Sequence, residues 1–260
     1  MAMNETILAF DIETIPDVEG GRRLYDLDGL SDADVASAIQ HKRLQDRGTD
    51  FLPHHLQRVA AISCVLRSSE GLRVWSLGKP DSDEKDLITR FFEGIERYKP
   101  TLVTWNGSGF DLPVLHYRAL MHGINAAVYW ETGRNDREAK WNNYLNRYHE
   151  RHTDLMDVLA GYSGRANAPL NEIALLLSLP GKMGLDGSQV WSTWLAGGIV
   201  DIRNYCETDA LNTYLIYLRF QQMRGLLPAK ILAEEQVLVR KTLEAAGADH
   251  LRAFLDAWPA

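Results

Sequence analysis

Three acidic segments, far apart in the chain, contain the side chains best suited to chemistry. Asp11 and Glu13 follow a short apolar run, Asp111 opens a predicted helix, and Tyr205 and Asp209 lie in a longer apolar stretch. On an extended chain, alternate residues project to the same face, so the first two acids share one side. On a helix, a spacing of four brings the phenol and the last carboxylate to one face.

Together, the four carboxylates predict a site for hard divalent cations, because carboxylate and water oxygens are the ligands that such ions prefer. Two ions about 3.5 to 4 Å apart can activate a water and stabilise the leaving oxygen in an in-line phosphodiester displacement. Tyr205 would orient or deprotonate that water. Taken singly, each segment has an ordinary interpretation: Asp11 and Glu13 as a solvated strand tip, and Asp111 as a helix cap.

Composition, charge and cysteine content narrow the class of protein that contains these segments. The chain has 260 residues, 45% of them hydrophobic and 24% charged, which is typical of a soluble globular protein and excludes disordered and membrane-spanning classes. The net charge of -7 argues against binding nucleic acid through overall charge but permits a local basic groove. Only Cys64 and Cys206 are present, so we expect no disulfide framework and a cytoplasmic protein.

Hydrophobic periodicity predicts alternating strands and helices. We expect strands over 7–10, 59–66, 72–77 and 101–105, and helices over 28–45, 81–98, 112–122, 154–162, 170–179 and 199–222. A short loop makes the second and third strands antiparallel. The sequence therefore predicts an α/β fold, with a mixed sheet flanked by helices in one domain over 1–225. Residues 226–260 would form its C-terminal helical extension, a helical pair broken near Gly247.

The order of the three motifs resembles the DEDD superfamily of 3′-to-5′ exonucleases, which implies a ribonuclease H-like fold. The matching segments are Phe10–Thr14, Trp105–Pro113 and Tyr205–Asp209. Tyr205, preceded by Asn204 rather than histidine, indicates the tyrosine (DEDDy) subclass. Within it, the chain resembles the predicted exonucleases related to the proofreading domain of family B DNA polymerases.

This resemblance implies a metal-dependent 3′-to-5′ exonuclease that acts on single-stranded DNA through two Mg²⁺ or Mn²⁺ ions. It implies a catalytic set of Asp11, Glu13, Asp111, Tyr205 and Asp209, in which the four acids bind the ions. Substrate contacts are expected from Thr14, Asn106 and Phe110, and a phosphate contact from Lys182. Two alternatives remain: the same chemistry on RNA, or a non-catalytic module that binds nucleic acid or a protein partner.

Other polar groups have weaker functional interpretations. The segment 131–151 mixes basic residues with Trp141, Tyr144 and Tyr148. We favour an amphipathic helix that packs these aromatics inward; the alternative is a flap that stacks on a single strand. His149 and His152 lack the spacing of a zinc-protease helix, so we expect no metal there. The pair His54-His55 is expected in a solvated loop that could border the site.

Overall fold

The computed structural model describes residues 5–259 and contains one mixed sheet of five strands in the order β3-β2-β1-β4-β5. Its strands are β1 (Ile7–Pro16), β2 (Gln57–Ser68), β3 (Gly71–Ser76), β4 (Thr101–Thr104) and β5 (His152–Asp154). β2 runs antiparallel to both β1 and β3, whereas β4 runs parallel to β1 and β5. The predicted α/β class, the mixed sheet and the antiparallel β2–β3 pair are confirmed.

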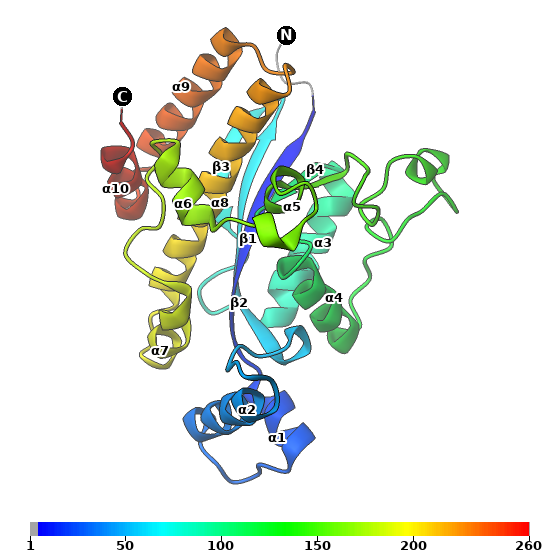
Figure 1. Ribbon diagram of the computed structural model, residues 1–260, viewed down its shortest axis with the longest axis vertical. Coiled ribbons are helices and arrows are strands. Elements are labelled where there is room, and N and C mark those ends of the chain that lie inside the picture. Colours follow the sequence, from blue (N-terminus) through cyan, green and yellow to red (C-terminus); the bar gives the residue numbers. More distant parts are fainter. Residues whose placement is uncertain (1–4, 260) are drawn as a thin grey trace.

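Helices cover both faces of this sheet. They are α1 (Val18–Tyr25), α2 (Asp32–Arg47), α3 (Glu84–Tyr98), α4 (Asp111–His122), α5 (Leu155–Leu159), α6 (Leu170–Leu176), α7 (Val190–Leu195), α8 (Ile199–Met223), α9 (Ala229–Ala246) and α10 (Asp249–Ala257). Figure 1 shows α8 along one face of the sheet, α3 and α4 toward the other, and α1 and α2 at one end of the molecule. Within residues 5–259, no helix is long and apolar enough to cross a membrane.

The alternation of side chains along β1 decides which layer each acid faces. Ile7 and Ala9 pack in the core shared with α8, whereas Leu8, Phe10 and Ile12 pack in the core shared with α3 and α4. Because successive strand residues point to opposite faces, Asp11 and Glu13 continue the row that faces α8. The strand therefore directs both carboxylates toward the helix that bears Tyr205 and Asp209.

The structure corrects the predicted position of these two acids. β1 continues to Pro16, so Asp11 and Glu13 lie within the strand rather than at its tip. β4 pairs with β1 only from Ile7 to Ala9, which leaves the later part of that edge without a strand partner. Because the short neighbouring strand ends, Asp111 can reach the backbone between the two acids, while their own strand continues along β2.

The elements that the sequence did not predict are short. β5 has only three residues and no apolar run, and α1 and α7 are short helices outside the expected ranges. The long helix expected over 199–222 is α8 almost to the residue, because nearly every face of it is buried. The predicted break near Gly247 is also present, with Gly247 in the left-handed conformation at the end of α9.

The two C-terminal helices pack on the same core as α8. Leu232, Leu243 and Phe254 are buried in the cluster that contains Tyr214 and Leu218 of α8. Arg67 at the end of β2 also forms a buried ion pair with Glu235 of α9, with 2.7 Å between Nη2 and Oε1. These contacts join α9 and α10 to the sheet; the domain boundary at residue 225 stays a prediction.

A buried ionic network holds α4, the helix that begins with Asp111. The Arg118 guanidinium pairs with Asp17, the cap of α1, and with Glu84 in the first turn of α3. Glu84 also accepts a hydrogen bond of 2.7 Å from the backbone of Val59 and another of 2.7 Å from His122. The arginine therefore fixes three helices relative to the sheet.

We expect Arg118→Ala to lower the free energy of unfolding by about 3 to 5 kcal/mol, because two buried carboxylates would lose their cation. Chemical denaturation measures the change. Arg90→Ala is the matched control and should change stability little, since Arg90 is an exposed arginine paired with Asp86 of the same helix, α3. Equal effects of the two substitutions would contradict the structural role of Arg118.

Candidate metal centre

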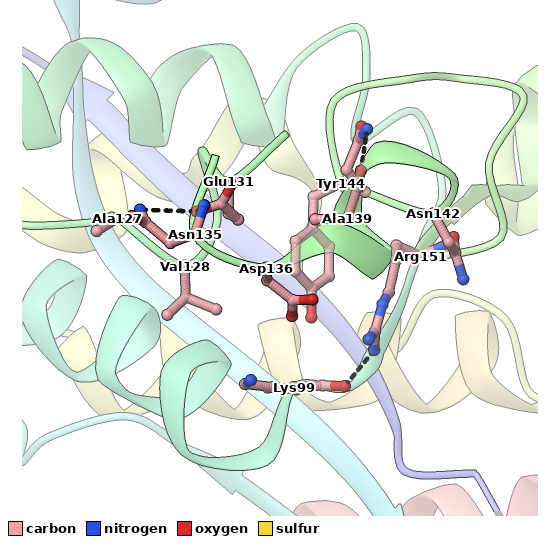
Figure 2. A pocket seen from close by; sticks show the side chains of 11 residues that line it. Lys99, Ala127, Val128, Glu131, Asn135, Asp136, Ala139, Asn142, Tyr144 and Arg151 are labelled. Atoms are coloured by element: carbon pink, nitrogen blue, oxygen red, sulfur yellow. Dashed lines mark hydrogen bonds between the residues drawn. The ribbon is translucent and has the colours of Figure 1, made fainter. Parts of the chain in front are cut away.

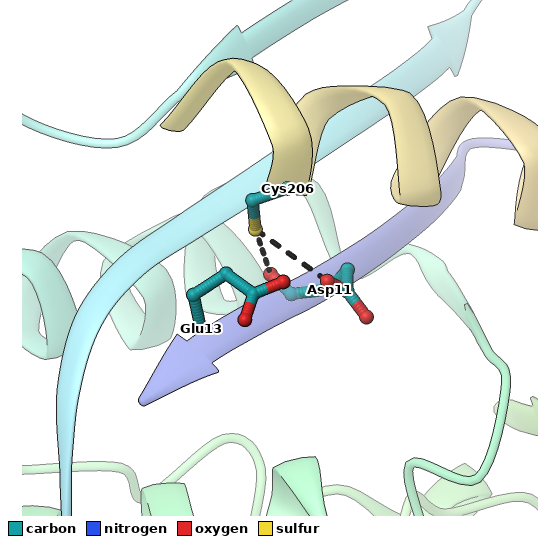
Figure 3. A group of neighbouring side chains, drawn as sticks. All are labelled: Asp11, Glu13 and Cys206. Carbon is teal, nitrogen blue, oxygen red and sulfur yellow. Dashed lines mark hydrogen bonds between the residues drawn. The ribbon is translucent and has the colours of Figure 1, made fainter. Parts of the chain in front are cut away.

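Asp11, Glu13 and Cys206 form the centre of the site (Figure 3). One ligand atom from each of the three side chains lies within 4.8 Å of the other two. The Cys206 thiol donates toward the backbone oxygen of Asp11 at 3.2 Å and toward its Oδ2 at 3.6 Å. Helix α8 is thereby tied directly to the acidic part of β1.

Asp111 joins this group from the edge of the sheet. Its Oδ1 accepts a hydrogen bond of 3.2 Å from the backbone nitrogen of Ile12, which lies between the other two acids. This nitrogen belongs to the part of β1 that β4 does not pair. The same hydrogen bond therefore gives this backbone nitrogen an acceptor and holds the third carboxylate at the site.

The loop before Asp111 is held by an acid from the next strand. Asp154 accepts hydrogen bonds from the backbone nitrogens of Asn106, at 2.9 Å, and Ser108, at 2.8 Å. Asn106 has a positive φ of 66°, and a Cβ on Gly107 would lie 2.4 Å from Thr104 Oγ1, so the tight turn requires a glycine there. The same side chain caps α5, because its Oδ1 also accepts a hydrogen bond of 3.4 Å from the backbone nitrogen of Asp157.

α8 supplies the fourth acid and the tyrosine. Tyr205 and Asp209 are 4% and 6% exposed, and both face the acids of β1. Asp209 Oδ1 is buried with no hydrogen-bond partner among the described residues. A buried carboxylate oxygen without a partner is costly, so this oxygen marks a place that a cation would fill.

Burial and mutual repulsion alter the acidity of the whole cluster. Burial, followed by the charges of neighbouring carboxylates, raises the pKa of Asp11 and of Glu13 well above its usual range. Burial raises the pKa of Asp111 to about 7 and that of Asp209 to about 6, and the nearby Lys182 charge partly offsets the shift at Asp209. A divalent cation would relieve this repulsion, so the donor set fits a hard metal ion.

The predicted substrate residues have different surroundings. Thr14 donates its hydroxyl to Gln57 at 2.9 Å, so that group is already engaged. The Phe110 ring lies 5.6 Å from Phe51 and 5.8 Å from His54, centroid to centroid. The histidine pair therefore borders the site, but it begins a short 3₁₀ helix (His54–Leu56), with His54 half-buried, rather than lying in the expected solvated loop. Lys182 Nζ lies 5.7 Å from the Tyr205 ring centroid, at the edge of the acidic cluster.

The remaining histidine candidates do not come together as metal ligands. His149 accepts a hydrogen bond of 3.0 Å from the backbone of Asn143, whereas the buried His152 lies 2.8 Å from Thr104 Oγ1. Cys206 is the residue of the site that sequence reasoning missed. Its place beside Tyr205 was visible in the sequence, but its contact with Asp11 arises only when α8 packs across β1.

The fold and the cluster define an α/β protein with a candidate centre for divalent metal. Residues 49–258 match the model of a family described as a predicted 3′-5′ exonuclease related to the exonuclease domain of PolB, and the chain belongs to this family. The matched range contains Asp111, Tyr205 and Asp209 but begins after β1. Asp11 and Glu13 of β1 lie outside the matched range, but in the folded protein they face α8, which lies inside it.

Several DNA polymerases are similar to part of this chain. The catalytic polypeptide of DNA polymerase epsilon from Aspergillus fumigatus is 28% identical over 145 residues, which cover 54% of this chain and 6% of that polypeptide. A DNA polymerase of Archaeoglobus fulgidus is 27% identical over 137 residues, 52% of this chain and 17% of the polymerase. The similarity therefore spans a small part of each relative.

Among solved structures, the family B DNA polymerase of Pyrobaculum calidifontis aligns with a TM-score of 0.48 and 16% identity. The alignment covers 92% of this chain and 28% of that polymerase chain.

Removing the Cys206 thiol tests its role in orienting Asp11. We expect Cys206→Ala to weaken Mn²⁺ binding by about tenfold or more, because groups that orient a ligand typically contribute such factors. Isothermal titration calorimetry measures the affinity. Cys64→Ala is the matched control, since Cys64 is also buried but packs in the opposite core. An unchanged affinity in Cys206→Ala would remove the thiol from the site.

The raised pKa values of Asp111, about 7, and Asp209, about 6, predict how stability depends on pH. Without metal, the acids of the cluster bind more protons in the folded state than in the unfolded state, so the contribution of the cluster to stability falls as pH rises from about 4 to about 7. At pH near 8 in chelator, Asp209→Asn should therefore stabilise the fold by about 1 to 3 kcal/mol. Thermal melting across this pH range measures the effect.

The exposed Asp256 provides the control, because Asp256→Asn should leave the pH dependence unchanged. Mn²⁺ should raise the melting temperature of the unsubstituted protein more at pH 8 than at pH 5, since ionised carboxylates bind the ion. If the stability difference between Asp209→Asn and the unsubstituted protein did not grow over this interval in chelator, that result would contradict the acidic cluster as described.

Proposed function

We propose that this chain is a divalent-metal-dependent exonuclease that removes nucleotides from the 3′ end of single-stranded DNA. The observation that carries the proposal is the unpartnered, buried Oδ1 of Asp209 beside three further carboxylates. Such a cluster of like charges destabilises a protein unless a cation occupies it. Membership of a family described as predicted 3′-5′ exonucleases supports the same activity.

In this proposal, Asp11, Glu13, Asp111 and Asp209 hold two ions, Mg²⁺ or Mn²⁺. When bound, the ions would supply a nucleophilic water and stabilise negative charge on the scissile phosphate. Without metal, burial and then the charge of Asp209 raise the pKa of the Tyr205 phenol above its usual range. We assign Tyr205 to orienting the nucleophile by a hydrogen bond, because its phenol lies on the same face of α8 as Asp209, one turn away.

Groups around the cluster suit the end of a nucleic acid strand. Lys182 carries a positive charge beside Tyr205, and Asp186 holds its ammonium with 3.6 Å between Nζ and Oδ2. The partly exposed ring of Phe110, flanked by Phe51 and His54, offers a face for the terminal base. No group identified at the site recognises a 2′-hydroxyl, so RNA remains the rival substrate. A cytoplasmic location stays a prediction.

The decisive assay uses matched single-stranded DNA and RNA oligonucleotides labelled at the 5′ end, with Mn²⁺ present. We expect products that shorten from the 3′ end, faster on DNA, and no products with Asp11→Ala. Tyr205→Phe should reduce the rate by about 10²-fold or more, because a positioned hydrogen bond to the reacting group is lost, while Mn²⁺ affinity is retained.

Asp157→Ala is the control, since this acid lies near the site but pairs with Arg147. It should keep most of the activity. Cleavage by Asp11→Ala at the rate of the unsubstituted protein would refute the assignment of Asp11 to the catalytic site. Preferential cleavage of RNA would show that RNA, rather than DNA, is the preferred substrate. Absence of cleavage of both polymers by a folded, metal-binding protein would refute the exonuclease.

A further inference from the structure

A surface of exposed aromatic and basic side chains lies outside the acidic cluster. We define this aromatic–basic surface as Lys140, Trp141, Arg147, Tyr148 and Tyr162. Trp141 is 76% exposed and Tyr148 is 72% exposed, which is unusual for rings of this size. The Lys140 Nζ lies 5.3 Å from the centroid of Trp141, and the guanidinium carbon of Arg147 lies 4.6 Å from that of Tyr162.

The amphipathic helix that we favoured from the sequence for residues 131–151 is wrong. Residues 131–151 form turns and the short 3₁₀ helix η2 (Arg137–Lys140) rather than an amphipathic helix. Only Tyr144 of the three aromatics packs inward, where its ring stacks on Tyr129 at 5.5 Å. The sequence contains no regular apolar period in this segment, so the backbone leaves Trp141 and Tyr148 on the outside.

Hydrogen bonds anchor this irregular segment around a pocket of about 250 Å³, whose lining residues Figure 2 draws. The Tyr144 hydroxyl donates to the oxygen of Pro100 at 2.8 Å, and Arg151 donates to the oxygen of Lys99 at 2.7 Å. Asn142 Oδ1 accepts from the backbone nitrogens of Glu150 and Arg151, which holds the two ends of the 142–151 loop together. The exposed rings are therefore presented by a pre-organised loop.

Contacts connect the surface to the loop that carries Asp111. Tyr148 packs edge-to-face on Tyr162 with 5.2 Å between centroids, and Arg147 pairs with Asp157 of α5 at 2.9 Å. One turn earlier, Asp154 binds the backbone of the Asn106–Gly109 loop. A chain of direct contacts thus runs from Tyr148, through Arg147 and across α5, to the loop that precedes Asp111.

Acidic side chains of the same segment are largely engaged elsewhere. Glu131 accepts hydrogen bonds from the backbone nitrogens of residues 133–135. Glu150 pairs with Arg224, the residue that follows α8, with 3.0 Å between Oε1 and Nη2. The aromatic rings therefore have basic neighbours on a protein whose overall charge is -7.

From these observations, we propose that the aromatic–basic surface binds the single-stranded nucleic acid upstream of its 3′ end. The proposal rests on the proposed function, because it assumes that the acidic site receives that end. Exposed aromatic rings interleaved with cations are suited to binding single strands, because the bases can stack on the rings and the phosphates can pair with the cations. Trp141 and Tyr148 would stack bases, and Lys140 and Arg147 would contact phosphates.

Fluorescence anisotropy tests the proposal without any cleavage. The probe is a labelled DNA strand of about 15 nucleotides, a length within the range of single-strand binding sites. It is added to Asp11→Ala protein in chelator, which prevents hydrolysis. When Trp141→Ala and Tyr148→Ala are both added to Asp11→Ala, we expect the affinity for the strand to fall by about tenfold or more, because two rings that stack bases are lost.

Tyr25→Ala is the matched control, since Tyr25 is an exposed tyrosine beside a cation, Lys42, but on α1. Its affinity should equal that of the Asp11→Ala background, and Trp141→Phe should restore most of the binding by retaining a ring. A strand of about three nucleotides, too short to reach beyond the site, should bind all variants equally. Melting temperatures confirm that each variant is folded.

Equal affinity of the double variant and the background for the longer strand would overturn the proposal, as would the absence of any strand binding. The proposal is also overturned if the double substitution changes only self-association or protein capture. Cleavage of the short strand by the unsubstituted protein in Mn²⁺ tests the acidic site separately. Surface-dependent binding without such cleavage would uphold single-strand binding by the aromatic–basic surface and refute the exonuclease.

Discussion

The burial of four carboxylates between β1 and α8 is the constraint on which the structure depends. Asp11 and Glu13 face α8, Asp209 lies on that helix, and Asp111 reaches in from the edge. Burial alone raises the pKa of such groups, and their proximity raises it further. A fold that keeps them together must hold their backbones firmly, because repulsion would otherwise separate them. The family to which the chain belongs gives a functional reason for retaining this destabilising arrangement.

The required rigidity comes from contacts around the cluster. α8 is buried along most of its length between the sheet and the C-terminal helices, so Asp209 and Tyr205 have little freedom to move. Arg118 ties α4 to α1 and α3 through buried ion pairs, and Asp154 holds the loop that leads into α4. Each acid thus stands on an element fixed by packing or by hydrogen bonds, as a pre-organised metal centre requires.

Local sequence patterns were reliable where one physical effect dominated. The alternation in β1, the long apolar α8 and the glycine at the end of α9 each follow from a single rule of burial or backbone conformation. Predictions failed where structure depends on distant partners. β5 is a strand only because β4 lies beside it, and the segment 131–151 is irregular because side chains such as Tyr144 and Glu131 bind backbone groups instead of forming a helix.

The sequence by itself determined the class of fold, the residue types of the acidic site and the resemblance to polymerase-related exonucleases. It could do so because side-chain chemistry and hydrophobic period are local properties of the chain. Only the tertiary structure decided that Asp11 and Glu13 lie inside a strand, that Cys206 contacts Asp11, and that Trp141 and Tyr148 are exposed. Those outcomes depend on where a neighbouring strand ends and on how α8 and the 131–151 segment pack, and such long-range contacts leave no periodic signal in the sequence.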